Sequence, residues 1–287
     1  MSLIEKAVAD LFKGSGLDQA NRDSPGRGTD LREAEELFLP RLGTEHKSSL
    51  DFNKLGQLGM VTPDKAMSRI AVELRHIKRR LLNETPEQSG VWVDGVYRNL
   101  IMVTSSIIGE GKTFLAINLA MNMAMEVGRR VVLVDTDVAN GDVAKVLGID
   151  AKPGLTDLLT CPNLTLLDVL ISTNIDGLQI LPVGTKIANV ADLYSSTKME
   201  RFLKAMAQQF ADRIIIFDGP PLLASSESSV LARFMGQVIV VVQEERTTQE
   251  DLLTGLKQIE FARNIGLVLN KSFDRSETMY FEDYQCV

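Results

Sequence analysis

From Arg98 onward, hydrophobic residues fall into two alternating kinds of segment. Short, nearly continuous apolar runs predict strands that are buried on both faces, at Leu100–Val103, Arg130–Val134, Leu178–Leu181, Arg213–Phe217, Gln237–Val242 and Ile265–Leu269. Longer stretches predict helices between them, at Phe114–Glu126, Asp192–Gln209, Ser226–Phe234 and Thr248–Glu260. This alternation predicts an α/β fold of three layers, in which helices cover both faces of a mostly parallel sheet.

The pattern before this region predicts a different organisation. A short amphipathic stretch, Leu3–Phe12, leads into sequence rich in Asp, Ser, Pro and Gly around residues 21–29, which can bury little surface. We therefore expect residues 1–62 to be a flexible N-terminal region with one short helix, residues 63–271 to be the main domain, and residues 272–287 to be a flexible polar tail.

A helical pattern at residues 63–83 opens the predicted domain. Ile70, Leu74, Ile77 and Leu81 share one face, and arginines and lysines surround them. These basic residues indicate contact with anionic lipid or a neighbouring subunit, or equally a solvated face on a helix docked against the domain.

Composition narrows the class of protein. The 287 residues are 45% hydrophobic, enough for a full core, and the formal net charge of −7 argues against general nucleic-acid binding. No apolar run approaches the roughly 20 residues that span a bilayer, and the start of the chain lacks the apolar segment of a signal peptide. We therefore expect a cytoplasmic protein. Cys161 and Cys286 are too scattered for a disulfide framework, and His46 and His76 lack metal-ligand spacing.

A glycine-rich turn joins the first predicted strand to the first predicted helix and carries the most specific chemistry. Gly109 and Gly111 let the backbone curl so that its N–H groups point inward, and the following helix adds the positive end of its dipole. Lys112 supplies an ammonium for phosphates, and Thr113 supplies a hydroxyl for Mg²⁺. The turn therefore predicts a nucleotide phosphate site.

Two other interpretations of this turn are weaker. Ser106 stands where a P-loop has its first glycine, so an ordinary strand-to-helix turn is one alternative, but the flanking strand and helix are the setting that the motif requires. A dinucleotide fold is the other, with Asp135 as the ribose-binding acid. It fails because Phe114 occupies the place of the third glycine.

Three aspartates follow predicted strands at the edge where such sheets bind ligands. Asp135 and Asp137 follow one strand, and Asp218 ends another. Asp218 suits a magnesium-binding role, and of the other two, one can complete the metal shell while the other orients or deprotonates an attacking oxygen. A single aspartate here is often a helix cap, but three beside one phosphate loop favour a site. Asn270 ends the last strand, and its amide can pair with an adenine edge.

Together these segments resemble the bacterial tyrosine kinases, which use a MinD-like P-loop fold. The resemblance covers about residues 63–271. It is carried by Thr104–Thr113 as Walker A, Val131–Asp137 as the family's Walker A′ segment and Ile214–Pro221 as Walker B. Three further segments resemble the exopolysaccharide-locus, PEP-CTERM/XrtA-associated tyrosine autokinases, at Met1–Ala7, Ala71–Leu82 and Phe217–Ala224.

The resemblance implies phosphoryl transfer from MgATP to tyrosine. It places Lys112 on the phosphates, Thr113 and Asp218 at the magnesium, Asp135 in support of the metal, and Asp137 as the base toward the tyrosine hydroxyl. Residues expected to bind ATP are Gly109, Glu110, Gly111, Lys112, Thr113, Phe114 and Asn270.

Family members phosphorylate a C-terminal tyrosine cluster on a neighbouring subunit and regulate polysaccharide polymerisation and export. Tyr280 and Tyr284 lie in the last eight residues of this chain and are the expected phosphoacceptors. The resemblance also implies self-association and a membrane-anchored chain-length-determinant or activator protein as partner. That partner would recruit this chain to the inner membrane.

Some positions depart from the family pattern and keep other functions open. Ala139 and Asn140 stand where the Walker A′ segment usually continues with arginine, which leaves open a nucleotide-binding regulator without kinase activity. A MinD/ParA-like ATPase switch is the other alternative. Those relatives usually carry a lysine at the place of Ile107, which counts against it.

Overall fold

The strands of the protein form a single mixed sheet. The computed structural model describes residues 46–83, 92–93 and 96–272. Within them the strand order is β1-β5-β6-β4-β7-β3-β8-β9, and β2 pairs with β3 outside this path. The strands are β1 (His46–Ser48), β2 (Trp92–Val93), β3 (Val96–Ser105), β4 (Arg130–Asp135), β5 (Ile171–Thr173), β6 (Leu178–Leu181), β7 (Arg213–Asp218), β8 (Met235–Gln243) and β9 (Ile265–Asn270).

Most neighbouring strands run parallel. Antiparallel pairing joins only β5 to β6 and β2 to β3 among the described residues. The helices are α3 (Phe52–Gln57), a 3-10 helix (Pro63–Lys65), α4 (Arg69–Asn83), α5 (Lys112–Ala124), α6 (Asp142–Leu147), α7 (Leu155–Thr160), α8 (Leu166–Val169), α9 (Val190–Tyr194), α10 (Thr197–Gln209), α11 (Glu227–Ala232) and α12 (Gln249–Gln258).

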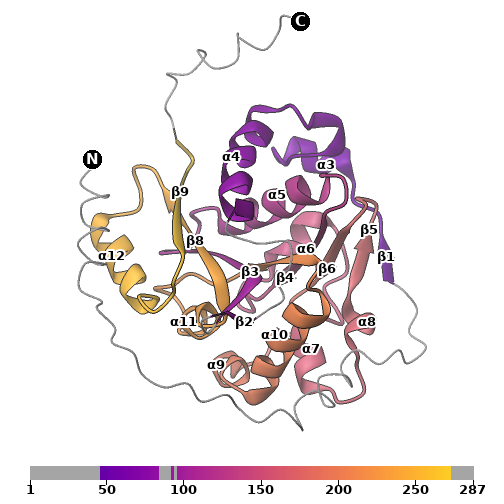
Figure 1. Cartoon of the computed structure of the whole chain (residues 1–287), viewed down its shortest axis with the longest axis vertical. Coiled ribbons are helices and arrows are strands. Elements are labelled where there is room, and N and C mark those ends of the chain that lie inside the picture. The colour runs from indigo at the N-terminus through magenta and orange to yellow at the C-terminus, as the bar shows by residue number, and fades with distance from the viewer. Residues whose placement is uncertain (1–45, 84–91, 94–95, 273–287) are drawn as a thin grey trace, which may run out of the picture. The chain divides into compact units, whose positions relative to one another are not determined.

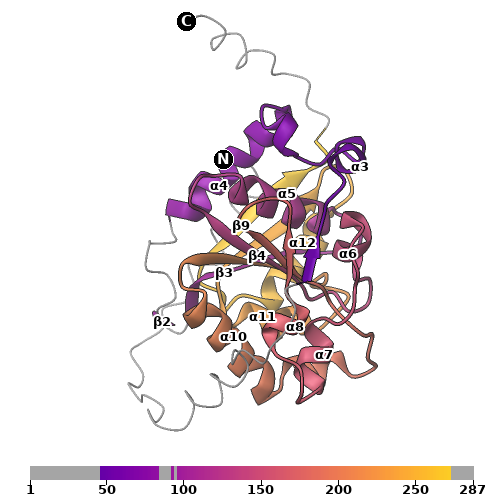
Figure 2. The ribbon, with the colours of Figure 1, turned by 90° about the vertical axis from the view of Figure 1, so that its right-hand side faces the viewer.

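Helices cover both faces of the sheet. Figures 1 and 2 show α3, α4 and α5 on one face and α7 to α11 on the other. The predicted three-layer α/β fold is therefore confirmed. Its central strands β3, β4 and β7 are buried along nearly their whole length, as their continuous apolar runs predict, because each face of a parallel sheet is covered by helices.

The hydrophobic core between the sheet and α5 holds the start of the P-loop helix in place. Ile101, Val103 and Ile216 on the sheet and Leu119 and Met123 on α5 have exposed fractions of zero. Buried apolar surface contributes about 25 cal/mol per Å², so this layer stabilises the packing of α5 against the sheet. The core therefore fixes where the N-terminus of α5 points.

Residues 46–62 pack onto the domain. Leu50, Leu55 and Val61 are buried in the core, and the Leu50 backbone N–H donates to the Asn174 side chain at 2.8 Å. The side chain of Asp51 accepts hydrogen bonds from the first turn of α3, which starts that helix. The predicted boundary after residue 62 thus falls inside packed structure. Residues 1–45 and 273–287, also predicted to be flexible, lie outside the described residues.

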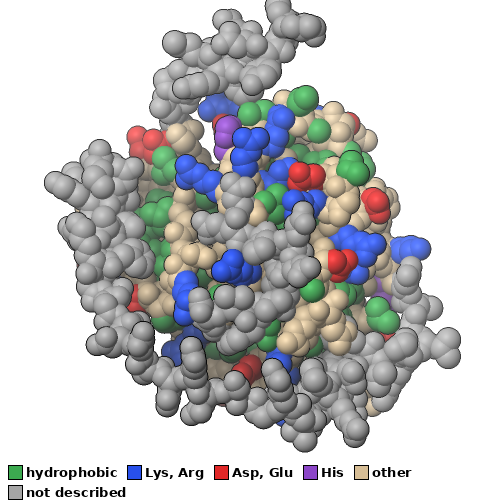
Figure 3. Space-filling model, in the orientation of Figure 1, with side chains coloured by type: hydrophobic (Ala, Val, Ile, Leu, Met, Phe, Trp, Pro, Cys, Tyr) green, Lys and Arg blue, Asp and Glu red, His purple; other side chains and the backbone are tan. Residues whose placement is uncertain are grey.

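The basic helix α4 docks by its apolar face. Ala71, Leu74 and Leu81 are buried against the core, and Figure 3 shows lysine and arginine side chains over the outer surface where α4 lies. The predicted amphipathic pattern is therefore confirmed. No helix within the described ranges is long and apolar enough to cross a membrane.

The helix predicted at residues 192–209 is wrong in one respect, because the structure has two helices there. The chain breaks between α9 and α10, where the Ser196 side chain accepts a hydrogen bond from the Met199 backbone N–H and caps α10. Such a cap competes with continued helix. The sequence patterns also predict none of the short elements α6, α7, α8 and β5.

Candidate active site

The site lies at the carboxyl edge of three adjacent strands. In the sheet β7 is flanked by β4 and β3, and Asp218 is in register with Asp135 on one side and Val103 on the other. Parallel strands end at the same edge, so the loop after β3 and the aspartates after β4 and β7 meet there. The sequence prediction that these segments converge is confirmed by this register.

The P-loop has the curled backbone that the two glycines predict. Gly109 has φ +88° and Gly111 has φ +97°, in the left-handed region that favours glycine. A side chain at Gly111 would also bring its Cβ within 2.1 Å of the Asn270 amide nitrogen. At the position of the missing first glycine, the Ser106 carbonyl instead accepts the Leu223 N–H at 3.0 Å. The loop keeps its curve without that glycine.

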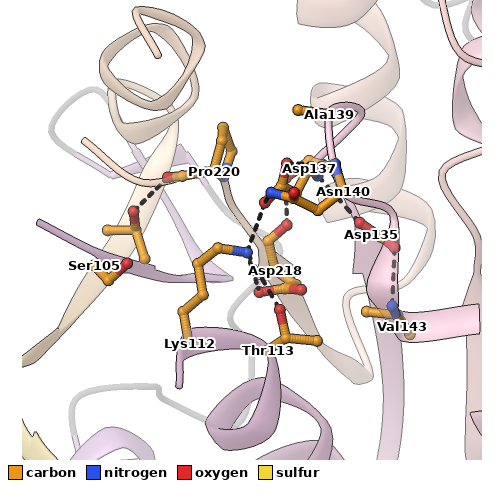
Figure 4. Close-up of polar contacts among 12 residues, drawn as sticks. Ser105, Lys112, Thr113, Asp135, Asp137, Ala139, Asn140, Val143, Asp218 and Pro220 are labelled. Carbon is orange, nitrogen blue, oxygen red and sulfur yellow. Dashed lines mark hydrogen bonds and ion pairs between the residues drawn. The ribbon is translucent and has the colours of Figure 1, made fainter. Parts of the chain in front are cut away.

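Lys112 lies at the centre of the site. Its Nζ is 2.8 Å from Asp137 Oδ2 and 3.5 Å from Asp218 Oδ1, and it donates to the Thr113 hydroxyl at 3.2 Å (Figure 4). Burial disfavours the charged ammonium, but Asp218 and Asp137 outweigh it and raise the pKa of Lys112. Lys112 is therefore a fixed positive charge in a buried acidic site.

Asp137 is the aspartate most strongly engaged by hydrogen-bond donors. Besides the Lys112 ion pair, it accepts from the Asn140 backbone N–H at 3.2 Å and from the Asn140 side-chain amide at 2.9 Å. Burial acts to raise the pKa of Asp137, but Lys112 and Asn140 outweigh it and hold that pKa below its usual value. Asp137 is thus a stabilised carboxylate in this state.

Asp218 and Asp135 are less well compensated. Burial, the largest influence, raises the pKa of Asp218 to about 6 even though Lys112 opposes it. Asp218 Oδ2 is buried and has no hydrogen-bond partner. Burial and the neighbouring Asp218 raise the pKa of Asp135 well above its usual value, although its carboxylate accepts the Asp137 and Val143 N–H groups at 3.1 and 3.3 Å.

These features fit a magnesium ion held together with nucleotide phosphates. The orphaned Asp218 oxygen and the nearby Thr113 hydroxyl are the hard oxygen donors that Mg²⁺ prefers. Over the part of the chain that the structure describes, no three His, Cys, Asp or Glu side chains come close enough to hold a metal by themselves.

The side chains of Asn270, Glu110 and Phe114, which were also predicted to bind the nucleotide, contact other parts of the protein instead. The Asn270 amide nitrogen donates to the Glu110 carbonyl at 2.8 Å, so this donor already holds the P-loop. The Glu110 carboxylate points back into the protein, where it accepts from the Ile107 N–H and the Thr247 hydroxyl. Phe114 packs against the core. Only the backbones of Glu110 and Phe114 therefore remain available to a phosphate.

Two supporting residues were not predicted from the sequence. Tyr194 is buried under the site, and its hydroxyl donates to the Thr136 carbonyl at 3.0 Å, while the Thr136 hydroxyl donates to the Asp218 carbonyl at 2.8 Å. The Lys186 ammonium donates to the Ala139 carbonyl at 2.6 Å, so a cation from another loop contacts the segment that lacks the usual arginine. Neither residue belongs to a motif, so only the fold reveals them.

Tyr280 and Tyr284, the predicted phosphoacceptors, lie outside the described residues. The structure therefore shows where the residues predicted to bind ATP lie, whereas the role of the two tyrosines as phosphoacceptors stays a prediction.

Comparisons with known proteins agree on one family. A family model described as an AAA domain matches residues 99–274, well over half of the chain. The tyrosine-protein kinase ptk of Acinetobacter johnsonii is 32% identical over 184 residues, which are 63% of this chain and 24% of that protein. This chain thus spans about a quarter of the length of that curated relative.

Solved structures give the same picture. The chimerical protein CapA2B2 is 25% identical with a TM-score of 0.65, and the similarity covers 85% of this chain and 99% of that one. The VpsO kinase domain is 29% identical with a TM-score of 0.56, over 71% of this chain and 100% of the domain. The fold is therefore shared with a solved kinase domain.

Proposed function

This chain belongs to the bacterial tyrosine kinase family and carries its AAA domain, and from that premise we propose that it transfers the γ-phosphate of ATP to tyrosine. The observation that carries the proposal is the meeting of Lys112, Thr113, Asp137 and Asp218 at the mouth of the P-loop. Phosphoryl transfer requires positioning and charge stabilisation more than covalent chemistry, and these residues supply both.

Each residue has a proposed role. The P-loop N–H groups and Lys112 bind the phosphates and balance the charge that develops on the transferred group. Thr113 and Asp218 would hold the magnesium, which would neutralise phosphate charge, and Asp135 would support the metal from the neighbouring strand end. The tyrosine oxygen bonds to the γ-phosphorus while the bond to the β–γ bridging oxygen breaks, and ADP leaves.

Asp137 is the proposed acceptor of the tyrosine proton. While Lys112 is paired with Asp137, the lowered pKa makes this carboxylate a weak base. Burial acts on Asp137 in the opposite direction and is its largest single influence. When nucleotide phosphates draw the Lys112 ammonium away, the pKa of Asp137 rises, and the carboxylate becomes a better base. Nucleotide binding would thus prepare the base.

We infer the phosphoacceptor tyrosines and the cellular role from the family to which the chain belongs. We propose Tyr280 and Tyr284 of a neighbouring subunit as acceptors, and a role in exopolysaccharide polymerisation and export through a membrane-anchored activator. The subfamily linked to PEP-CTERM and XrtA remains a prediction from the sequence. Magnesium and ATP are the proposed cofactor and donor.

The full chain incubated with MgATP tests this function. We expect mass spectrometry to find phosphate on Tyr280 or Tyr284 in the natural chain and none in Lys112→Met, whose fold is checked by circular dichroism. Addition of the cytoplasmic segment of a membrane partner should raise the level. ATP hydrolysis without phosphotyrosine would instead indicate an ATPase switch. Nucleotide binding with neither reaction would indicate a regulator without kinase activity.

A further inference from the structure

Two side chains from the turns after β8 and β9, and a third from the last residue of β9, hold three successive carbonyl groups of the P-loop. Arg246 Nη2 donates to the Ile108 carbonyl at 2.8 Å, and Lys271 Nζ donates to the Gly109 carbonyl at 2.9 Å. Asn270 continues the series at the Glu110 carbonyl. These two turns lie side by side because β8 and β9 are parallel neighbours (Figure 1).

The direction of each of these carbonyl groups determines the direction of the N–H group in the same peptide unit of the P-loop. A phosphate-binding loop works when successive backbone N–H groups point into one concave surface. Carbonyl groups held on the outer side by charged donors cannot turn toward the phosphates, where they would repel them. The contacts from Arg246 and Lys271 therefore favour the phosphate-binding form of the loop over other curled forms.

The two cations are themselves oriented. Gln243 Oε1 accepts from both Arg246 Nη1 and Lys271 Nζ, at 3.3 and 3.1 Å. The guanidinium also lies close against the loop, because a Cβ added to Gly109 would be 2.8 Å from Arg246 Nη1. The Arg246 side chain therefore packs closely against the P-loop at Gly109.

The backbone of both turns gives an independent sign of this role. Glu245 has φ +60° and Lys271 has φ +56°, and these are the described non-glycine residues with positive φ. Such residues are held in a costly conformation that persists where the surroundings determine it, and they gather at functional sites. Here they lie in the two turns that contact the P-loop.

We propose that Arg246 and Lys271 are positioning residues for nucleotide binding, which act by holding the Ile108 and Gly109 carbonyls outward. Neither side chain needs to touch the nucleotide. The proposal rests on the proposed function only in taking a nucleotide as the ligand, and its test does not require kinase activity.

The test measures MgADP affinity of the full chain by titration calorimetry. We expect Arg246→Met and Lys271→Met each to raise the dissociation constant by about tenfold, the effect of losing one charged hydrogen bond, and the double variant to raise it further. In tyrosine phosphorylation, KM for ATP should rise while kcat changes little. Arg246→Lys, which keeps a charged donor, should recover part of the affinity.

The controls separate positioning from general stability. Arg246 and Lys271 are exposed, so the unfolding midpoint of each variant without nucleotide should match that of the natural chain. The exposed Lys257 on α12 is the matched control, and Lys257→Met should leave MgADP affinity unchanged.

Three outcomes would overturn this inference alone. In the first, the double variant binds MgADP as tightly as the natural chain. In the other two, its weaker binding is matched by Lys257→Met or by a lowered unfolding midpoint. Each of these leaves the proposed function intact. A natural chain that binds no MgADP would overturn the proposed function itself along with this positioning role.

Discussion

At the scale of single residues, one ammonium balances three buried carboxylates. Lys112 forms ion pairs with Asp137 and Asp218, while Asp135 lies in register with Asp218 and accepts hydrogen bonds from two backbone N–H groups. Burial is the main reason that the pKa of Asp135 and of Asp218 is raised, and a neighbouring aspartate adds to the rise in each case. A divalent cation would offset this cost, which supports the proposed Mg²⁺ site.

Asp218 gives the first prediction, concerning stability and pH. A carboxyl group with a higher pKa in the folded than in the unfolded protein lowers stability as it ionises, here between its ordinary pKa of 3.8 and the folded pKa of about 6. We expect Asp218→Asn to lack this loss and to be more stable than the natural chain by about 2 kcal/mol near neutral pH. Urea unfolding at several pH values measures the difference. A variant that is less stable at neutral pH would contradict the account.

For Lys112 we predict that substitution lowers stability, in contrast to the gain expected for Asp218→Asn. Lys112→Met leaves Asp137 and Asp218 without their cation, so we expect a loss of about 3 kcal/mol of unfolding free energy near neutral pH. The pKa of Asp137 is lowered by Lys112, so this stabilisation is present above about pH 4 and disappears as Asp137 protonates below it. The same urea series measures it. An equal loss at acid and neutral pH would show that packing, not charge, explains the effect.

At the scale of elements, the site depends on strand order and on a layer of helices packed behind it. Apolar runs predict β3, β4 and β7 because these strands are buried on both faces, and their aspartates mark the binding edge. Residues 46–62 show why the hydrophobic pattern of the sequence does not predict some other elements. Leu50 stands singly among polar residues, and Leu55 and Val61 continue no helical or strand-like repeat, so no periodic pattern indicates that they are buried.

Helix α3 allows that assignment to the domain to be tested. Leu55 is 1% exposed, whereas Leu58 at the end of the same helix is 50% exposed. We expect Leu55→Ala to lower the free energy of unfolding by about 2 to 4 kcal/mol, because it opens a cavity in the core. Leu58→Ala is the matched control and should change it by less than about 0.5 kcal/mol. Equal, small effects would mean that this segment contributes nothing to the domain.

At the scale of the whole molecule, the tyrosines of the chain fall into two classes. Tyr97 and Tyr194 are 4% and 1% exposed, so neither can enter a site as a substrate without unfolding. The two remaining tyrosines, Tyr280 and Tyr284, are in the C-terminal segment outside the described residues. Any phosphorylation of this protein by itself is therefore expected there.

The residues proposed to bind ATP and magnesium were far more predictable from the sequence than the residues that hold the surrounding loops in place. Lys112, Thr113 and the three aspartates stand in short motifs next to apolar runs, so spacing alone brings them together. Arg246, Lys186 and Tyr194 contact residues that lie 138, 47 and 58 positions away in the sequence, and no motif includes them. Their roles depend on the tertiary arrangement, which local patterns do not encode.

The measurement that tests the central claim most directly is phosphate transfer between two full-length chains. One chain carries Lys112→Met and keeps both tail tyrosines, and the other keeps Lys112 but carries Tyr280→Phe and Tyr284→Phe. After incubation together with MgATP, we expect mass spectrometry to find phosphate on Tyr280 or Tyr284 of the Lys112→Met chain, which gains none when incubated alone. ATP hydrolysis with no phosphotyrosine on either chain would contradict the account.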